Sequence, residues 1–411
     1  MAEKTSSWKI EDEKNYPKLQ GKLEADVVII GAGLVGVLNA YFLSKAGLKV
    51  IVLEKDKAIL RHKTLFTTAF ITKEIDTDFS RLESFLGRKK AKLVWQSGED
   101  AIGIFASLAA EENIDCEFTP VSSYTYAKDK KEFEDLKKEY QIIKDAEMDI
   151  SLKEDGQELN FPNAGFWELP HQAKFHPIKF AARVAELAEK SGVKFYTNSE
   201  VLEVKDGIAK TKDAQVKAKD ILIATYRPLI HKGTHFKKGM YVTYMYELQI
   251  PRGLIPEAIY QDMHEPYHYF RIDPKGEYDR MIVGGEDHRV EIKMDKDKNF
   301  KALLEYVKTV LGDKEFTIVR KWTGGILESI DGLPFIGEID KHLYVATAFS
   351  GTGMTYSAIS AMIIRDLILK KENPYIDLYN PKRIPNLKSL LIKGKDYLSI
   401  LYGGAIKNIF K

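Results

Sequence analysis

The chain has 411 residues, of which 44% are hydrophobic and 30% charged, a globular composition with enough apolar residues for two domains. A net charge of +2 gives no field that would attract nucleic acid, and the single cysteine, Cys116, excludes a disulfide framework, a cysteine zinc site and an iron–sulfur cluster built on this sequence. The N-terminus is polar and no apolar run reaches about 18 residues, so we expect neither a signal peptide nor a membrane-spanning helix. We therefore expect a cytoplasmic protein.

The most informative segment lies near the N-terminus. Residues 27–30 are apolar and β-branched, as in a strand buried on both faces, and GAGLVG at 31–36 then matches G-x-G-x-x-G. Residues 34–46 have helical spacing, residues 49–53 form a second apolar strand, and Glu54 follows about 20 residues after the glycines. Such a unit binds a dinucleotide, with the pyrophosphate at the helix N-terminus and the ribose at the acidic residue. It does not distinguish FAD from NAD.

The rest of the chain alternates between helical and extended patterns. Residues 1–24 are expected to form a surface arm. We expect helices within 72–112, 128–144, 179–191, 299–312 and 355–370, and strands within 116–127, 166–176, 193–204, 219–225 and 343–346. Residues 241–249, 267–272 and 280–284 alternate in a way that predicts an antiparallel sheet, whereas residues 331–337 are interpreted as a turn-rich segment and 349–353 as a second glycine turn.

Parallel βαβ elements at both ends of the chain and near 177–225, with antiparallel material between them, predict an α/β fold. In it, a discontinuous Rossmann-like nucleotide-binding domain carries an inserted α+β substrate domain built on an antiparallel sheet. The predicted nucleotide-binding segments are 1–75, 177–235 and 320–380, the substrate or cap segments are 76–176 and 236–319, and residues 381–411 form a basic tail.

Four motifs, in order, resemble the D-amino-acid oxidase family of flavoproteins, which includes glycine oxidase and sarcosine oxidase. They are GAGLVG with Glu54, ILIAT at 221–225, DGLPFIG at 331–337 and FSGTGMTYSA at 349–358. The likeness extends over nearly the whole chain and implies FAD rather than NAD. The likeness is greatest to a subgroup in which a Rieske domain follows the flavoprotein, and it rests on QAKFHP at 172–177, YHYFR at 267–271 and GGEDH at 284–288. This sequence has no cysteine pairs, so we expect it to lack the Rieske domain.

The resemblance implies an FAD site, and a helix N-terminus beside the flavin suits the negative charge of the reduced ring. The implied cofactor residues are Gly31, Gly33, Leu34, Gly36, Glu54, Lys55, Thr68, Val201, Ala224, Thr225, Gly351, Thr352, Gly353 and Met354. The loop at 64–70 has Leu65 and Phe66 where the related subgroup usually has glycine and histidine, and 322–327 has no cysteine for a covalent link. We therefore expect noncovalent FAD.

Candidate catalytic residues follow from the antiparallel segment. Because side chains alternate along a strand, Arg271, Tyr269 and Tyr267 are expected on one face, where a guanidinium and two phenols would clamp a substrate carboxylate. The alternative is an ordinary arginine on an aromatic sheet. His268 and His176 are candidates for a base or for shaping the flavin site, with core packing as the alternative for each. No metal site is assigned.

The leading hypothesis is oxidation of a small amine or amino acid by hydride transfer to flavin N5, which gives an imine that hydrolyses. The electron acceptor would be O2 or a separate redox protein. Sarcosine oxidases have a lysine in the substrate sheet that helps O2 to react, and the comparable residues 280–283 include none, so the resemblance implies a dehydrogenase more than an oxidase. The alternatives are a flavin-binding scaffold or electron-transfer protein with little turnover, and a 2-hydroxy-acid dehydrogenase. The basic tail is interpreted as closing over the domain, with contact to a membrane surface as the alternative.

Overall fold

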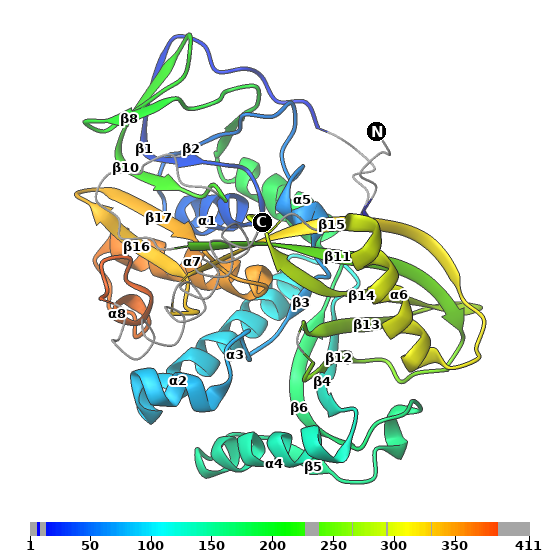
Figure 1. Cartoon of the computed structure of the whole chain (residues 1–411). Helices are drawn as coiled ribbons and strands as arrows, with labels where there is room; N and C mark the ends of the chain where they lie inside the picture. The colour runs from blue at the N-terminus through cyan, green and yellow to red at the C-terminus, as the bar shows by residue number, and fades with distance from the viewer. Residues whose placement is uncertain are drawn as a thin grey trace, which may run out of the picture.

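The fold consists of two sheets with helices packed on them (Figure 1), as seen in a computed structural model. This arrangement confirms the predicted α/β class. The structure describes residues 6–8, 14–226, 238–264, 266–292, 295–329 and 331–384. The predicted tail therefore falls almost entirely outside the described residues.

The first sheet has a parallel core in which the two strands of the glycine motif are neighbours. Its strand order is β16 (Phe335–Asp340), β17 (Leu343–Thr347), β10 (Gln215–Ile223), β1 (Lys22–Ile30), β2 (Val50–Leu53) and β7 (Lys194–Tyr196), and the hairpin of β8 (Glu203–Lys205) and β9 (Ile208–Lys210) pairs with β10. Ile30 lies opposite Ile223 on one side and Leu53 on the other, so three carboxyl ends meet at one edge. Ligands of open parallel sheets bind at that edge.

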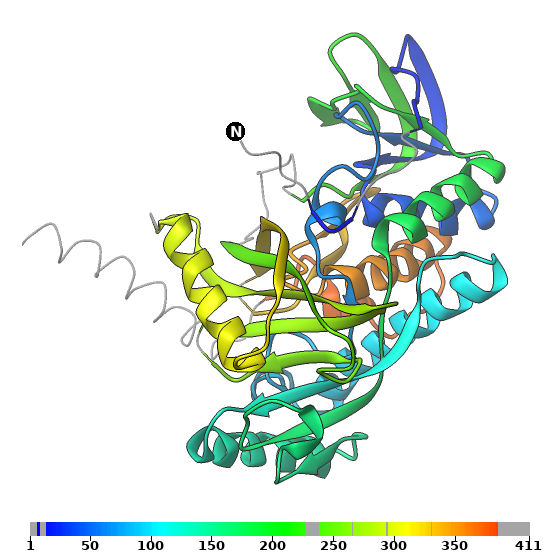
Figure 2. The ribbon, with the colours of Figure 1, turned by 90° about the vertical axis from the view of Figure 1, so that its right-hand side faces the viewer.

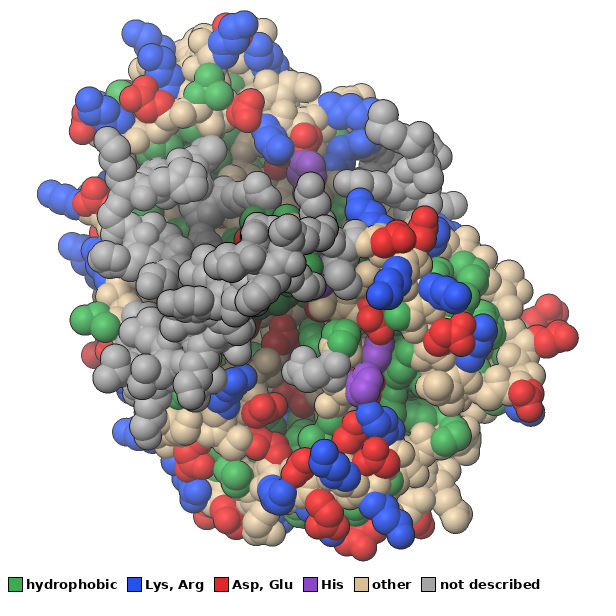
Figure 3. All heavy atoms as spheres, in the orientation of Figure 1, with side chains coloured by type: hydrophobic (Ala, Val, Ile, Leu, Met, Phe, Trp, Pro, Cys, Tyr) green, Lys and Arg blue, Asp and Glu red, His purple; other side chains and the backbone are tan. Residues whose placement is uncertain are grey.

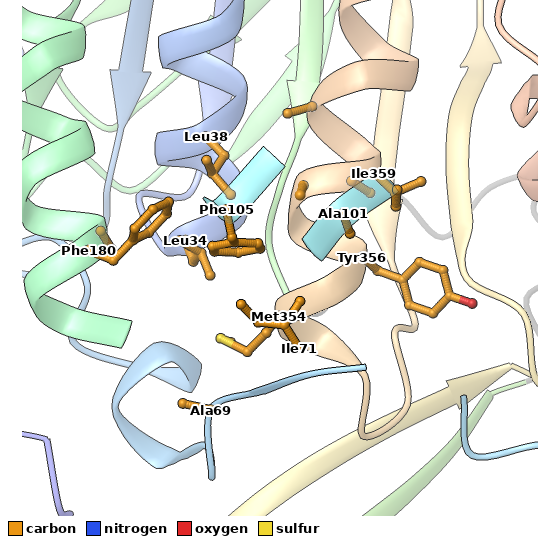
Figure 4. Packing of buried hydrophobic residues seen from close by; sticks show 14 of the residues in the cluster. Leu34, Leu38, Ala69, Ile71, Ala101, Phe105, Phe180, Met354, Tyr356 and Ile359 are labelled. Carbon is orange, nitrogen blue, oxygen red and sulfur yellow. The ribbon is translucent and has the colours of Figure 1, made fainter. Parts of the chain in front are cut away.

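Both faces of this sheet are buried, which explains the unbroken apolar run of β1. Val27 and Ile29 pack into one hydrophobic cluster with the helices, whereas Val28 and Ile30 pack into another with the β8–β9 side. Helices α1 (Leu34–Lys45), α5 (Pro177–Lys190) and α7 (Gly353–Leu369) cover the first face, and α3 (Arg88–Glu111) packs against α7. Figure 4 shows Leu34 and Leu38 of α1 beside Phe105, Phe180 and Met354 from the other three helices.

The second sheet is mostly antiparallel and one of its faces is closed by α6 (Lys296–Leu311), as Figure 2 shows. Its order is β15 (Thr317–Ser329), β11 (Lys238–Pro251), β14 (Tyr278–Arg289), β13 (His268–Lys275), β12 (Ile259–Asp262), β4 (Thr119–Ala127), β6 (Gly165–Lys174) and β3 (Phe70–Ile71), with β5 (Ser151–Lys153) paired to β6. Tyr244 and Tyr246 pack against Phe300 of α6. Their neighbours Thr243 and Met245 consequently face the other side.

The remaining elements are short helices and helices outside the packed face described above. They are η1 (Lys63–Phe66), α2 (Phe79–Leu86), α4 (Lys130–Asp145), η2 (Gln157–Leu159) and α8 (Ile376–Tyr379). No helix among the described residues is long and apolar enough to cross a membrane.

Three local predictions differ from the structure. Residues 317–329 form a long strand of the second sheet that was not predicted, because its two central glycines and mixed polarity hide the alternation. Residues 335–337, the end of the segment 331–337 that was interpreted as turn-rich, belong to β16. The expected surface arm includes Trp8, which is 2% exposed. The division into domains remains a prediction, and since both β3 and β15 belong to the second sheet, the proposed boundaries at 75 and 320 do not separate the sheets.

Candidate active site

The first glycine turn lies where β1, β2 and β10 end side by side. Gly31 donates its N–H to the Leu53 carbonyl over 2.8 Å, and Ala224 donates to the Ile30 carbonyl over 2.9 Å. Gly31 has a φ of 105°, and a Cβ on it would lie 2.9 Å from the Ala224 carbonyl oxygen. Both the backbone conformation and the neighbouring strand therefore require glycine at this position.

Gly33 and Gly36 have different tasks. A Cβ on Gly36 would overlap the carbonyl oxygen of Gly31, so α1 can pack on the turn only because this residue has no side chain. Gly33 lines the cavity at the start of α1, where the Leu34 N–H donates to Thr64 Oγ1 over 3.1 Å. The helix N-terminus thus faces open space, as a pyrophosphate site needs.

Glu54 is held in place at the end of β2. Its Oε2 accepts the Ala32 N–H at 2.8 Å and its Oε1 accepts the Asp56 N–H at 3.1 Å. Each carboxylate oxygen accepts more than one hydrogen bond, so both retain capacity for ribose hydroxyls. Lys55 and Val201 line the same cavity.

The second glycine turn leads into α7 and is strained. Ala348 and Ser350 have φ values of 61° and 52°, and Asp76 Oδ2 accepts the Gly351 N–H at 2.5 Å. Thr352, which is 7% exposed, has a buried Oγ1 without a partner. Left-handed conformations at non-glycine residues cluster at functional sites. A strained turn with an orphan hydroxyl at a helix N-terminus is therefore a good candidate for ligand contact.

One cavity of about 560 Å³ joins the two turns. Phe66 forms part of its wall and Leu65 packs against the hydrophobic core, so neither side chain closes the groove between the turns. Gly36 lies outside the lining and serves helix packing. The other predicted cofactor residues all line the cavity: Gly31, Gly33, Leu34, Glu54, Lys55, Thr68, Val201, Ala224, Thr225, Gly351, Thr352, Gly353 and Met354.

The second sheet provides the opposite wall of the cavity. Thr243, Gln261, Tyr267 and Tyr269 line it, and the hydroxyls of Tyr269 and Thr243 are 2.9 Å apart. Burial raises the pKa of both phenols, and nearby carboxylates raise it further. Both tyrosines are therefore neutral hydrogen-bond donors.

Two acidic residues that the sequence did not single out complete this wall. Glu74 and Asp76 line the cavity, and the Ser123 hydroxyl donates to Glu74 Oε1 over 2.8 Å. Burial raises the pKa of Glu74 to about 7, and the charge of Asp76 also raises it. The sequence placed these acids after the threonine loop, but only the crossing of this segment from β3 towards the second turn brings them to the cavity.

The predicted substrate clamp at Arg271 is wrong. Alternation does place Arg271 on the same strand face as Tyr269, but Thr68 and Ala69 run over it. Its Nη1 donates to the carbonyls of both, at 3.0 and 2.9 Å, and its Nη2 donates to Asp273 over 2.7 Å. Arg271 is 1% exposed and does not line the cavity. It supports the loop beneath the cavity instead of contacting substrate.

The two candidate histidines also lie away from the cavity lining. His268 Nδ1 is 2.8 Å from Asp262 and its Nε2 is 3.1 Å from Glu286, and its ring stacks on Tyr306. It points away from Tyr269, as strand alternation requires. His176 Nδ1 accepts the Lys179 N–H and caps α5. The proposed catalytic role of His268 is therefore corrected to a structural one, and the packing alternative holds for His176.

Trp8 ties the N-terminal segment to the same region. Its Nε1 donates to the Thr67 carbonyl over 2.7 Å, and its ring lies 5.4 Å from the Arg271 guanidinium and 5.0 Å from that of Arg280. The loop at 67–69 is thus held from two sides. In the described ranges, no group of three His, Cys, Asp or Glu side chains is placed to bind a metal ion.

The fold and the cavity define a dinucleotide-binding protein, and comparison with known proteins shows which family it is. Residues 26–367 match the family described as FAD dependent oxidoreductase (DAO). The chain belongs to this family, and its cofactor is FAD.

Individual relatives are distant. The chain is 27% identical to the putative Rieske 2Fe-2S iron-sulfur protein YhfW of Bacillus subtilis over 97% of this chain and 80% of the relative. It is 22% identical to gamma-glutamylputrescine oxidoreductase of Escherichia coli over 90% of each. Glycine oxidase from Geobacillus kaustophilus has a similar fold, with a TM-score of 0.74 at 18% identity, covering 88% of this chain and 99% of that one. L-proline dehydrogenase from P. horikoshii has a TM-score of 0.73 at 20% identity, covering 89% and 98%.

The residues present fit FAD at both ends of the cavity. Gly33 leaves the α1 N-terminus open to a pyrophosphate, and Glu54 retains acceptor capacity for a ribose. At the other end, the unpartnered Thr352 hydroxyl and the start of α7 offer donors to the flavin ring. The predicted cofactor is confirmed, and the individual contacts remain proposals.

Proposed function

We propose that the protein oxidises a small amine or amino acid to an imine, which water then hydrolyses. The observation that supports this most directly is the shared cavity, which joins the two FAD turns to a wall of tyrosine, threonine and carboxyl side chains. When bound, FAD supplies the acceptor for a hydride from the substrate carbon.

The second sheet would orient the substrate. The hydroxyls of Tyr267 and Tyr269 are neutral donors on the cavity wall, and Thr243 holds the Tyr269 hydroxyl. The side chains of Phe66 and Phe70 line the same cavity. A fixed site of this kind holds a reacting carbon in position.

Glu74 would accept the proton that the amine must lose. An ammonium group cannot release a hydride from its neighbouring carbon, so the substrate has to become neutral first. Burial raises the pKa of Glu74 to about 7, which lets the carboxyl group both accept and release a proton near neutral pH. The bond from substrate nitrogen to hydrogen breaks, and a carboxyl O–H forms.

The electron acceptor that reoxidises the flavin is proposed to be O2 or a separate redox protein. FAD is proposed to be noncovalent, since Cys116 is buried in the hydrophobic core and does not line the cavity. Acid precipitation of the purified protein should therefore leave all of the flavin in solution.

Anaerobic titration tests the proposal. The FAD-loaded protein is mixed with panels of amines, amino acids and 2-hydroxy acids, and the visible flavin absorbance is followed. Bleaching by an amine or amino acid is expected. Bleaching by hydroxy acids alone would identify a hydroxy-acid dehydrogenase, and bound flavin that no compound reduces would identify a scaffold or electron-transfer protein.

A further inference from the structure

The start of the chain is buried, although the rest of the surface looks ordinary. Figure 3 shows Lys and Arg side chains interspersed with Asp and Glu over the described residues of one face, and such mixing gives a charged partner no preferred place. Ser6, Ser7 and Trp8, in contrast, are all buried. The first residues of most domains are poorly ordered unless they are tied down, so this burial needs a cause.

The backbone of this segment is fixed to the edge of the second sheet. Arg320 of β15 donates from Nη1 to the Ser6 carbonyl over 2.9 Å, and its Nε is 2.8 Å from the Glu247 carboxylate on the neighbouring strand β11. The Ser6 hydroxyl accepts the Trp8 N–H at 3.3 Å and donates to the Trp8 carbonyl over 3.1 Å. These contacts set the point at which the Trp8 side chain enters the protein.

Trp8 differs from the other tryptophans in its indole nitrogen. The chain has four tryptophans, and all four are buried. The indole nitrogens of Trp95, Trp167 and Trp322 have no hydrogen-bond partner, whereas Trp8 Nε1 donates to the Thr67 carbonyl over 2.7 Å. Packing alone is therefore enough to bury an indole in this protein, and the hydrogen bond of Trp8 is an additional, directed contact.

That contact completes the anchoring of one loop of the cavity wall. The Thr67 carbonyl accepts from Trp8, and the carbonyls of Thr68 and Ala69 accept from Arg271 at 3.0 and 2.9 Å. Ala69 has a φ of 61°, a left-handed conformation that persists at a non-glycine residue only where the surroundings enforce it. Thr67 and Thr68 line the cavity, but Trp8 and Arg271 do not, so both anchors act from behind the wall.

From these contacts we propose that Trp8 is a positioning residue of the FAD site: its indole N–H fixes Thr67 and Thr68 against the cofactor. Docking of the N-terminal segment and retention of FAD then stabilise each other, because coupling between two binding events is reciprocal. Without the anchor, FAD itself would have to order the loop, and part of its binding free energy would be lost. The inference goes beyond the proposed function, since it concerns the cofactor and not the substrate.

The test compares FAD release from two tryptophan variants. Trp8→Phe keeps a buried ring beside Arg271 and Arg280 but has no donor for Thr67. After dilution of the FAD-loaded protein, free flavin in the filtrate should appear about three- to tenfold faster than for wild type, the factor that corresponds to one hydrogen bond. The visible circular dichroism of the bound flavin should also change. Trp95→Phe is the matched control and should release FAD as wild type does, because its buried indole has no partner and lies outside the cavity lining.

Chemical rescue separates the hydrogen bond from the filled space. Trp8→Ala removes the whole ring and should release FAD at least about tenfold faster than wild type. Added indole should slow this release towards the wild-type rate, whereas benzothiophene, which has nearly the same shape but no N–H, should not. If Trp8→Ala does not fold, the comparison of Trp8→Phe with Trp95→Phe decides by itself.

The outcomes separate positioning from packing. Wild-type FAD release and flavin dichroism in Trp8→Phe would overturn the proposal, and so would equally fast release from Trp95→Phe. Rescue by benzothiophene as effective as rescue by indole would also overturn it, because filled space would then be the whole contribution of Trp8. If Trp8→Phe loses FAD as expected but no amine or amino acid reduces the flavin of the wild-type protein, the positioning role stands and the proposed oxidation fails.

Discussion

Replacing Arg271 with leucine distinguishes structural support from substrate binding. The side chain donates to Asp273 and to the carbonyls of Thr68, Ala69 and Phe175, all in the interior. Removing one partner of a buried ion pair costs about 3–5 kcal/mol, and the three carbonyls lose a donor as well. Because Arg280 and Lys174 still neutralise Asp273, we expect the lower part of this range. At about 2–4 °C per kcal/mol for a large domain, the Tm should fall by on the order of 10 °C.

Thermal denaturation of the FAD-loaded protein, followed by far-ultraviolet circular dichroism, measures the loss. Arg183→Leu is the control, because that residue forms a partly exposed ion pair with Glu186 on α5, and such pairs contribute at most about 1 kcal/mol. Below the melting transition, the KM of Arg271→Leu for any reducing amine should stay close to the wild-type value. A variant that melts like wild type but binds its substrate far more weakly would show that Arg271 reaches the cavity, contrary to the contacts described above.

Three further perturbations have defined outcomes. Gly36→Ala should abolish FAD retention on gel filtration and destabilise the fold by about 1–3 kcal/mol, because the added methyl group overlaps the Gly31 carbonyl; full retention would contradict the close packing. Glu74→Gln should raise the Tm above pH 7 but not at pH 4. The folded pKa of Glu74 is about 7 instead of 4.5, so the wild-type protein loses up to about 3 kcal/mol of stability as the pH rises between those values, and glutamine removes this loss. An equal gain in Tm at both pH values would count against burial as the cause. His268→Gln should destabilise the protein more at pH 6 than at pH 9. Burial opposes the charged ring, but Asp262 and Glu286 raise the pKa of His268 above the ordinary 6.5. The ion pairs of the charged ring therefore stabilise the fold fully below pH 6.5, and this stabilisation is lost as the pH rises through the folded pKa. A pH-independent loss would mean that the ring is neutral throughout.

Local chemistry was sufficient to predict the cofactor half of the site. A strand, three glycines, a helix and a terminal acid are consecutive in the chain, and each acts within about 20 residues of the others. Hence Gly31, Gly33 and Glu54 lie where the sequence placed them, and Gly36 permits the close packing of α1 on the turn that the motif predicts. The second turn at 349–353 came from the resemblance, and its proximity to the first is a property of the parallel sheet.

The substrate half depended on contacts between segments that are distant along the chain. Alternation correctly put Tyr269 and Arg271 on one face of β13, yet it carries no information about the loop at 68–69 that covers the arginine. Similarly, nothing in the order of residues shows that Glu74 and Asp76 line the cavity beside the second sheet. Strand pairing and the crossing of loops bring these charged groups together. The same contacts decide which groups line the cavity and how far the pKa of each is shifted.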